Sequence, residues 1–252
     1  MWRFIGASVM GAAHQSTNTA CQDCCHVEQI QIAQQDYLLA LVTDGAGSAL
    51  QGGQGAALAC YALAKSIKSQ LIANQPFEQQ LIHQALVSAR VLLQQQAQAN
   101  GLELRDYAST ILGIVIAPQQ AIAFQIGDGA IVANIHHYQG VVFWPDNGLY
   151  ANMTYFLTDE DYKQHLHLQT IDATIQEVML FSDGLQRLAL SFDTKMPHEP
   201  FFAPIFKALR ANNANTKLLN QHLAQFLASD VINKRTDDDK TLVLATKRLE
   251  TK

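Results

Sequence analysis

The sequence predicts an α+β fold. Its strand-like segments come in runs and its helical segments come in pairs, whereas a parallel α/β protein alternates the two. With 252 residues, of which 48% are hydrophobic, the chain is long enough to bury a sizeable core. No internal repeat and no linker-like stretch interrupts it. We therefore expect a single domain over residues 1–252.

The first 55 residues are predicted to be mostly strand and loop. Residues 2–10 contain strand-favouring Trp, Phe and Val, and residues 11–25 are polar and rich in turn formers. Two apolar runs over 27–43 are split by Gln34-Gln35-Asp36, which predicts a hairpin. A glycine-rich loop follows over 45–55.

A pair of helices is predicted next, over 54–73 and 77–99. Each has apolar residues at steps of three or four, which is typical of one buried helix face. Pro76 and Gly101 are good boundary signals for the second helix. The two apolar stripes are Cys60, Leu63, Ile67 and Leu71, and Leu81, Ala85, Ala89 and Leu92.

The second half of the chain is predicted to begin with four successive strands and to end with helices and a last strand. Residues 145–174 between these parts show few signals and are expected to be irregular. The expected strands are 110–117, 121–126, 130–135, 140–144, 175–182 and 241–245, and the helical segment is 199–228.

Composition excludes several classes of partner. Charged residues make up 15% of the chain and the net charge is −5, so no basic stripe for nucleic acid is present. No apolar run has membrane length and the N-terminus does not resemble a signal peptide. We expect a cytoplasmic protein without nucleic-acid or membrane partners.

Three of the four cysteines lie together at Cys21, Cys24 and Cys25, and the fourth is Cys60. A structural zinc site would need a second pair of soft ligands, and only Cys60 is available. Reduced, partly buried thiols are the favoured interpretation.

Two aspartate turns are the strongest functional signal. Val42-Thr43-Asp44-Gly45 and Phe181-Ser182-Asp183-Gly184 both follow an apolar run, which is typical of a buried strand that ends in a turn. Such an Asp is held rigidly at the rim of the core. The Gly lets the backbone turn so that its carbonyl can approach an ion.

Further carboxylates occupy similar junctions at Asp128 and at Asp238 or Asp239. Taken singly, an Asp-Gly pair is most often only a turn. Four such junctions together favour a site for hard divalent cations, because these ions prefer oxygen ligands and clustered carboxylates repel one another without them.

The order of motifs resembles the metal-dependent protein phosphatases, the type 2C family of serine/threonine phosphatases, and most of all their compact bacterial branch. The resemblance spans nearly the whole chain. Its motifs are Gly11-x-x-His14, Gln22-Asp23, Thr43-Asp44-Gly45-Ala46-Gly47-Ser48, Ala108-Ser109-Thr110, Ile126-Gly127-Asp128-Gly129, Phe181-Ser182-Asp183-Gly184-Leu185 and Asp238-Asp239-Lys240-Thr241-Leu242-Val243.

This resemblance implies a four-layer αββα sandwich, in which two antiparallel sheets pack face to face with helix pairs outside. It places a variable, flap-like segment at about 145–174, and the stretch from Pro145 to Asn152 is similar to one in the bacterial branch. It also implies a cytoplasmic enzyme that acts on phosphorylated proteins, the targets of a serine/threonine kinase. A monomer is the favoured state.

The resemblance further implies two bound ions, Mn²⁺ or Mg²⁺, and a third at a weaker site. Asp44 would bridge the first two ions, with the Gly45 carbonyl as a further ligand. Asp183 would serve the first ion and, with Asp128, the third. Asp238 would complete the first site, Asp23 would support the second, and Gln22 and Asp239 are secondary candidates.

The chain departs from the family pattern at three positions. Gln22 stands where an acidic residue is usual, Asn18 where an Arg usually binds phosphate, and Ala46 where some members have a proton-donating His. His14 is our candidate for a phosphate contact or proton donor; the alternative is a loop histidine with local hydrogen bonds.

The predicted function is hydrolysis of phosphoserine and phosphothreonine by metal-activated water, without a phosphoenzyme. Two alternatives stay open: a catalytically weak or inactive member that binds or senses phosphoproteins, and a hydrolase of small phosphate esters. A serine nucleophile is disfavoured because no Gly-x-Ser-x-Gly elbow exists. The pairs His136-His137 and His165-x-His167 are interpreted as surface features rather than metal ligands.

Overall fold

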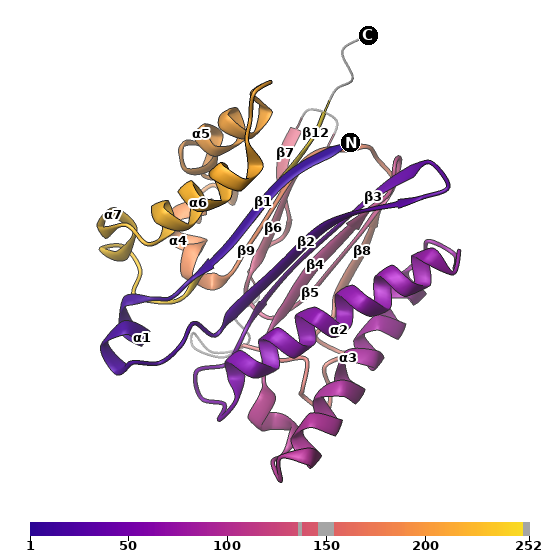
Figure 1. The fold of residues 1–252 in the computed structure, drawn as a ribbon, viewed down its shortest axis with the longest axis vertical. Helices are drawn as coiled ribbons and strands as arrows, with labels where there is room; N and C mark the ends of the chain where they lie inside the picture. Colours follow the sequence, from indigo (N-terminus) through magenta and orange to yellow (C-terminus); the bar gives the residue numbers. More distant parts are fainter. Residues whose placement is uncertain (136–137, 146–153, 249–252) are drawn as a thin grey trace.

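The computed structural model describes residues 1–135, 138–145 and 154–248. Two five-stranded antiparallel sheets form its centre. Figure 1 shows α2 and α3 along the outer side of one sheet and α5 and α6 along the outer side of the other. The predicted α+β class and the αββα sandwich are therefore confirmed.

One sheet has the strand order β2-β3-β4-β5-β8. Its last strand was not predicted, because residues 145–174 were expected to be irregular; β8 pairs with β5, so that Ala121 lies opposite Ile171. The strand alternates between exposed and half-buried residues, which leaves little apolar signal. The bounds are β2 Asp23–Ile32, β3 Gln35–Asp44, β4 Ile111–Ile116, β5 Ala121–Ile126 and β8 His167–Ile171.

The other sheet has the order β1-β12-β9-β6-β7 and is also antiparallel. All its strands were predicted to within a few residues. A separate two-stranded ribbon, β10 Leu190–Ser191 and β11 Met196–Pro197, lies beyond β9. The bounds are β1 Trp2–Val9, β6 Ala130–Ile135, β7 Tyr138–Phe143, β9 Ile175–Phe181 and β12 Lys240–Lys247.

The predicted β2–β3 hairpin is present, but it is longer and turns earlier than expected. Its turn residues are Ala33 and Gln34, with φ of 46° and 68°, so both adopt the left-handed conformation that two-residue hairpin turns need. Pairing continues back to Asp23 opposite Asp44. The polar character of residues 21–25 concealed the start of β2.

The core has three apolar layers because the central strands are buried on both faces. On β3, Leu38, Ala40 and Val42 face the other sheet, whereas Leu39 and Leu41 face α2 and α3. The opposite sheet likewise presents Met179 and Leu244 to α5 and α6. A strand buried on both faces has a continuous apolar sequence rather than an alternating one.

The helices confirm the predicted pairs. α2 spans Gly52–Ile72 and α3 spans Gln79–Ala99, while α5 spans Glu199–Arg210 and α6 spans Thr216–Leu227. A short helix at Ala12–Thr17 replaces the loop expected there. The remaining helical elements are α1 Ala12–Thr17, η1 Leu104–Tyr107, η2 Asp183–Leu185, α4 Gln186–Ala189 and α7 Asp230–Asn233.

Among the helices of the described residues, none is long and apolar enough to cross a lipid bilayer.

Candidate functional site

The register of β2 and β3 brings two of the predicted aspartates together. Asp23, the first residue of β2, lies directly opposite Asp44, the last residue of β3. Thr110 fixes the Asp44 backbone, because its hydroxyl accepts from the Asp44 N–H at 3.2 Å and its own N–H donates to the Asp44 carbonyl at 2.8 Å. The first aspartate turn is thus held from both sides.

The other acidic turns end beside it. Phe181, at the end of β9, pairs with Leu242 of β12 on one side and with Ala130 of β6 on the other. Asp183 therefore emerges between the segment that carries Asp238 and the turn that carries Asp128. Antiparallel pairing places turns that are far apart in the sequence at one edge of the sandwich.

These turns surround an open pocket of about 230 Å³. Seven of the predicted site residues line it, and Asp23 and Asp239 do not. The lining residues are His14, Gln22, Asp44, Gly45, Ala46, Gly47, Ser48, Thr110, Asp128, Thr154, Phe156, Asp183 and Asp238.

Asp23 lies behind the pocket, in contact with Asp44, and is 9% exposed. The Ser182 hydroxyl donates to Asp23 Oδ2 at 2.7 Å and accepts from the Thr241 N–H at 3.0 Å. Ser182 thereby ties the turn after β9 to β2 and β12. No role was predicted for Ser182, although a hydroxyl residue precedes Asp-Gly in both turns.

Asp239 is a structural anchor in this arrangement. Its Oδ1 accepts from the Gly11 N–H at 2.6 Å, and its Oδ2 accepts from the Gln22 N–H at 2.5 Å. The His14 Nδ1 atom lies 3.0 Å from Oδ2 but off the direction of a hydrogen bond. Of the two adjacent acids, it is Asp238 that faces the pocket.

His14 reaches the pocket from α1. The N–H of Ala13 donates to the Asp237 carbonyl at 2.9 Å, which attaches the helix to the segment before β12. The His14 side chain is 21% exposed, so it borders the pocket while Asp239 lies behind it. The His14 ring therefore faces the site, and its Nδ1 atom makes no hydrogen bond within the described residues.

Burial and mutual repulsion raise the pKa values of the acidic cluster. Burial, opposed by the Ser182 hydrogen bond, raises the pKa of Asp23 to about 6. Burial and the charge of Asp128 raise the pKa of Asp183 to about 7. The Asp44 pKa is raised well above its usual value by burial and by Asp23, and burial also raises that of Asp238. Such perturbed carboxyl groups in a cleft are typical of functional sites.

The donor set suits a hard divalent cation. Buried oxygens of Gln22, Asp23 and Asp183 have no hydrogen-bond donor in the described part of the chain except a neighbouring carboxyl group. Oxygen atoms of this kind are what Mg²⁺ and Mn²⁺ bind. Within that same part of the chain, no three His, Cys, Asp or Glu side chains stand close enough together to hold an ion as they are placed.

Strongly basic side chains are missing from the described lining of the pocket. Neither Arg nor Lys is among the lining residues, and His14 is the one basic side chain in that set. Asn18 ends α1 with φ of 55°, in a left-handed conformation. The hydroxyls of Ser48 and Thr154 border the pocket, and Thr154 Oγ1 is buried without a partner in the described residues. Ser48 ends the first Asp-Gly motif but was assigned no role from the sequence, and no sequence signal marked Thr154.

The other sequence candidates that the structure describes are not part of the pocket. All four cysteines are free, and the pKa of Cys24 is lowered to about 7 by a hydrogen bond with Cys60. His165 stacks on Tyr155 and lies 3.2 Å from Asp161. His136, His137 and residues 146–153 of the expected flap lie outside the described residues.

Comparisons with known proteins agree on one family. The family model for protein phosphatase 2C matches residues 10–228. The chain is 41% identical to serine/threonine-protein phosphatase 3 of Escherichia coli (strain K12), and the match covers 97% of this chain and 98% of that protein.

Solved structures share the fold. The Mycobacterium tuberculosis serine/threonine phosphatase PstP/Ppp superposes with a TM-score of 0.65 at 16% identity, covering 98% of this chain and 99% of the other. The catalytic domain of PstP in complex with two manganese ions gives 0.63 at 16% identity, with 97% of each chain covered. Stp1 from Staphylococcus aureus gives 0.60 at 14% identity, covering 99% of this chain and 96% of that one.

Proposed function

The chain belongs to the protein phosphatase 2C family, and from that premise we propose that it is a metal-dependent serine/threonine protein phosphatase. The observation that carries this proposal is the pocket itself. Acid-bearing turns from β3, β5–β6, β9 and the start of β12 converge on it in the order that the family resemblance implies.

Asp44 is the proposed ligand shared by both ions, with the Gly45 carbonyl as a further ligand, and Asp183 and Asp238 would complete the shell of the first ion. Asp23 and Gln22 support the second ion, and Asp128 with Asp183 offers a third, weaker site. Two Mn²⁺ or Mg²⁺ ions are expected, since a related fold is known with two manganese ions. Bound there, they would activate a water and neutralise charge on the phosphoryl oxygens.

The backbone supports this geometry. A side chain at position 45 would place its Cβ 2.3 Å from the Gly52 carbonyl, and one at 184 would place it 2.0 Å from the Asp239 carbonyl. Both distances are far below contact, so only glycine allows these turns to pack so closely. The Asp44 and Asp183 turns are thereby held close to their neighbours.

His14, Ser48 and Thr154 are the proposed contacts of the phosphoryl group. His14 is oriented by Asp239 and would donate a hydrogen bond to a phosphoryl or leaving-group oxygen. The two hydroxyls supply neutral donors. Because no Arg or Lys lines the pocket, phosphate binding depends on the cations more than on side-chain charge.

The same lack of basic side chains favours a second candidate function, a weakly active or inactive member that binds or senses phosphoproteins. Ala46, where some members carry a proton donor, offers only a methyl group. A hydrolase of small phosphate esters is the remaining alternative.

Turnover measurements with Mn²⁺ distinguish these functions. We expect the wild type to hydrolyse p-nitrophenyl phosphate and a phosphothreonine peptide. Asp44→Asn should lose both activities, whereas Asp193→Asn should keep both, because Asp193 is an exposed acid outside the pocket. Activity absent at every metal concentration would favour the binding module. Turnover of the small ester alone would favour the ester hydrolase.

The physiological setting follows from the same proposal. The substrates would be proteins phosphorylated by a serine/threonine kinase, encountered in the cytoplasm by a monomeric enzyme. Size-exclusion chromatography with light scattering measures the oligomeric state directly.

A further inference from the structure

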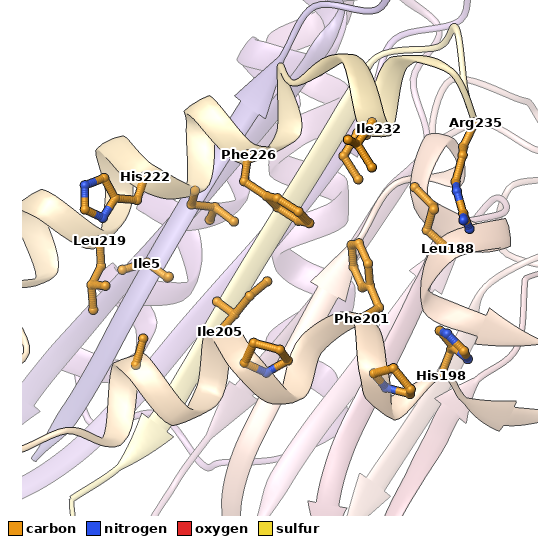
Figure 2. Close-up of a pocket in the computed structure, with 15 residues that line it drawn as sticks. Ile5, Leu188, His198, Phe201, Ile205, Leu219, His222, Phe226, Ile232 and Arg235 are labelled. Atoms are coloured by element: carbon orange, nitrogen blue, oxygen red, sulfur yellow. The ribbon is translucent and has the colours of Figure 1, made fainter.

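A second cavity, of about 500 Å³, opens on the far side of the sandwich between α5 and α6. Its walls come from α5, α6 and α7, and its floor from Ile5 of β1 and Leu188 of α4. The cavity is called the α5–α6 groove below. Figure 2 shows Phe201 and Phe226 projecting toward one another across it; their ring centroids are 6.0 Å apart.

The groove exists because one face of α5 carries only small side chains. Pro200, Pro204 and Ala208 line it at four-residue steps, so they lie one above the other on a single helix face. None of these side chains can reach across to α6. Phe202, Phe206 and Leu209, on the sheet-facing side of the same helix, are buried in the core instead.

The groove is apolar along its length and basic at one end. Arg235 and His198 lie together at one end in Figure 2, and His222 lies at the other. No carboxylate is among the lining residues. The acids next to these elements in sequence, Glu199 and Asp230, are exposed and do not line the groove. Within the described residues, the structure shows no ion pair for Arg235.

A cavity of this size and lining matches the usual small-molecule site, which is mostly apolar with a few polar groups that fix orientation. We propose that the α5–α6 groove binds an elongated amphipathic anion, an aliphatic carboxylate of about ten to twelve carbons. Its charged end would pair with Arg235 and His198. Its chain would lie over the contacting rings of Phe201 and Phe226 and extend toward Ile205 and Leu219.

Occupation of the groove is linked to the acidic pocket through shared segments. Leu188 comes five residues after Asp183, and Arg235 comes three before Asp238. The two segments pack tightly where Gly184 meets Asp239, and buried Lys240 donates to Asn233 of α7 at 2.7 Å and to the Met10 carbonyl at 3.4 Å. We therefore expect a ligand in the groove to alter metal binding in the acidic pocket. This expectation rests on the proposed function, whereas binding in the groove does not.

Calorimetric titration of the metal-free protein with octanoate, decanoate and dodecanoate, each below its micelle concentration, tests the site. We expect one saturable site and about fourfold tighter binding per added methylene, the ratio that corresponds to about 0.8 kcal/mol each. The gain should stop when the chain outgrows the groove. Decanamide should bind about tenfold more weakly than decanoate, because it lacks the charge-assisted hydrogen bonds.

Three variants locate the binding. Ala208→Trp fills the groove and should abolish it, while Gln225→Trp places the same indole on an exposed position of α6 outside the lining and should not. Arg235→Gln should reduce the preference for decanoate over decanamide to less than about threefold. Because Arg235 is exposed, Arg235→Gln should fold normally, so the site can still be tested if Ala208→Trp does not fold.

Several results would overturn the site: binding that Ala208→Trp leaves unchanged, many equivalent weak sites, or binding of an amphipathic helical peptide but of no carboxylate.

A metal titration tests the link between the groove and the acidic pocket. Saturating dodecanoate should shift the Mn²⁺ dissociation constant at least about fivefold in the wild type and not in Ala208→Trp. An equal constant in both proteins would refute the link and leave the groove site standing.

Discussion

The acidic pocket and the α5–α6 groove are opposites in chemistry, although the segments 183–190 and 232–240 contribute to both. The pocket encloses about 230 Å³ among carboxylates that repel one another. The groove encloses about 500 Å³ among aromatic and aliphatic side chains with a basic end. No Arg or Lys is among the described lining residues of the pocket, and no carboxylate is among those of the groove.

This difference shows how two kinds of site arise from one scaffold. The pocket results from turn chemistry, because each carboxylate is placed by a strand end and held by backbone contacts such as those of Thr110 and Asp239. The groove results from missing volume, because small residues stand where a longer side chain would close the helix layer. Variants that affect one site and spare the other test this separation.

The largest expected effect is the loss of activity in Asp44→Asn. Removing the shared carboxylate weakens the binding of both cations, which would supply several kcal/mol of transition-state stabilisation, so kcat/KM should fall at least about a thousandfold. Steady-state hydrolysis of p-nitrophenyl phosphate with Mn²⁺ measures it.

The same variant should bind dodecanoate in metal-free protein as tightly as the wild type does, because its substitution lies outside the groove. Full activity in Asp44→Asn would refute the shared-ligand assignment. Lost dodecanoate binding would refute the separation of the two sites.

The pocket was largely predictable from the sequence, and the groove was not. Asp44, Asp128 and Asp183 stand in Asp-Gly turns after apolar runs, and Asp238 comes just before the last strand, so their convergence follows from the antiparallel sheets. Pro200, Pro204 and Ala208 carry no motif. Their effect depends on the distance between α5 and α6, which tertiary packing sets.

Within the fold, the elements that were missed had weak local signals. β8 alternates without a strong apolar face, and α1 has no buried residue. The role of Ser182 was also missed, since a serine beside a turn has many ordinary explanations. The pairing of β9 with β12 places Ser182 beside Thr241, and only the packed structure shows that its hydroxyl also reaches Asp23 of β2.

The next largest effect contrasts two phenylalanines of the groove layer. Phe206 is 1% exposed beneath the groove, whereas Phe226 is 37% exposed at its edge. Phe206→Ala should lower the free energy of unfolding by about 3–5 kcal/mol, and Phe226→Ala by about 1 kcal/mol, the worth of an aromatic contact. Urea denaturation compares them. Equal losses would mean that the groove edge belongs to the core.

A third prediction concerns pH. Burial raises the pKa of Asp23 to about 6 and of Asp183 to about 7, above the value of about 3.9 expected in the unfolded chain. A raised folded-state pKa favours the folded protein below the unfolded value, and this contribution is lost as pH rises through the folded value. The metal-free protein should therefore lose stability between about pH 4 and pH 7.

Cations should reverse that loss by compensating the ionised carboxylates. The rise in melting temperature on adding Mn²⁺ should be larger at pH 8 than at pH 5, by at least about 4 °C, which corresponds to roughly 1–2 kcal/mol for a chain of this size. Differential scanning fluorimetry with and without EDTA measures both values. An equal rise at the two pH values would contradict the assigned ligands; Asp44→Asn is the control and should show a smaller rise.

The smallest expected effect is that of Ser182→Ala, which removes the hydroxyl that donates to Asp23 at 2.7 Å. Loss of a hydrogen bond that orients a ligand typically weakens metal binding about 10- to 100-fold. We expect the apparent Mn²⁺ constant to rise by that factor while kcat at saturating Mn²⁺ returns to near the wild-type value. Ser191→Ala, on β10 and outside both cavities, is the matched control. A low kcat that Mn²⁺ does not restore would instead mean that Ser182 supports the fold of the turn, because Thr241 also bonds to its hydroxyl.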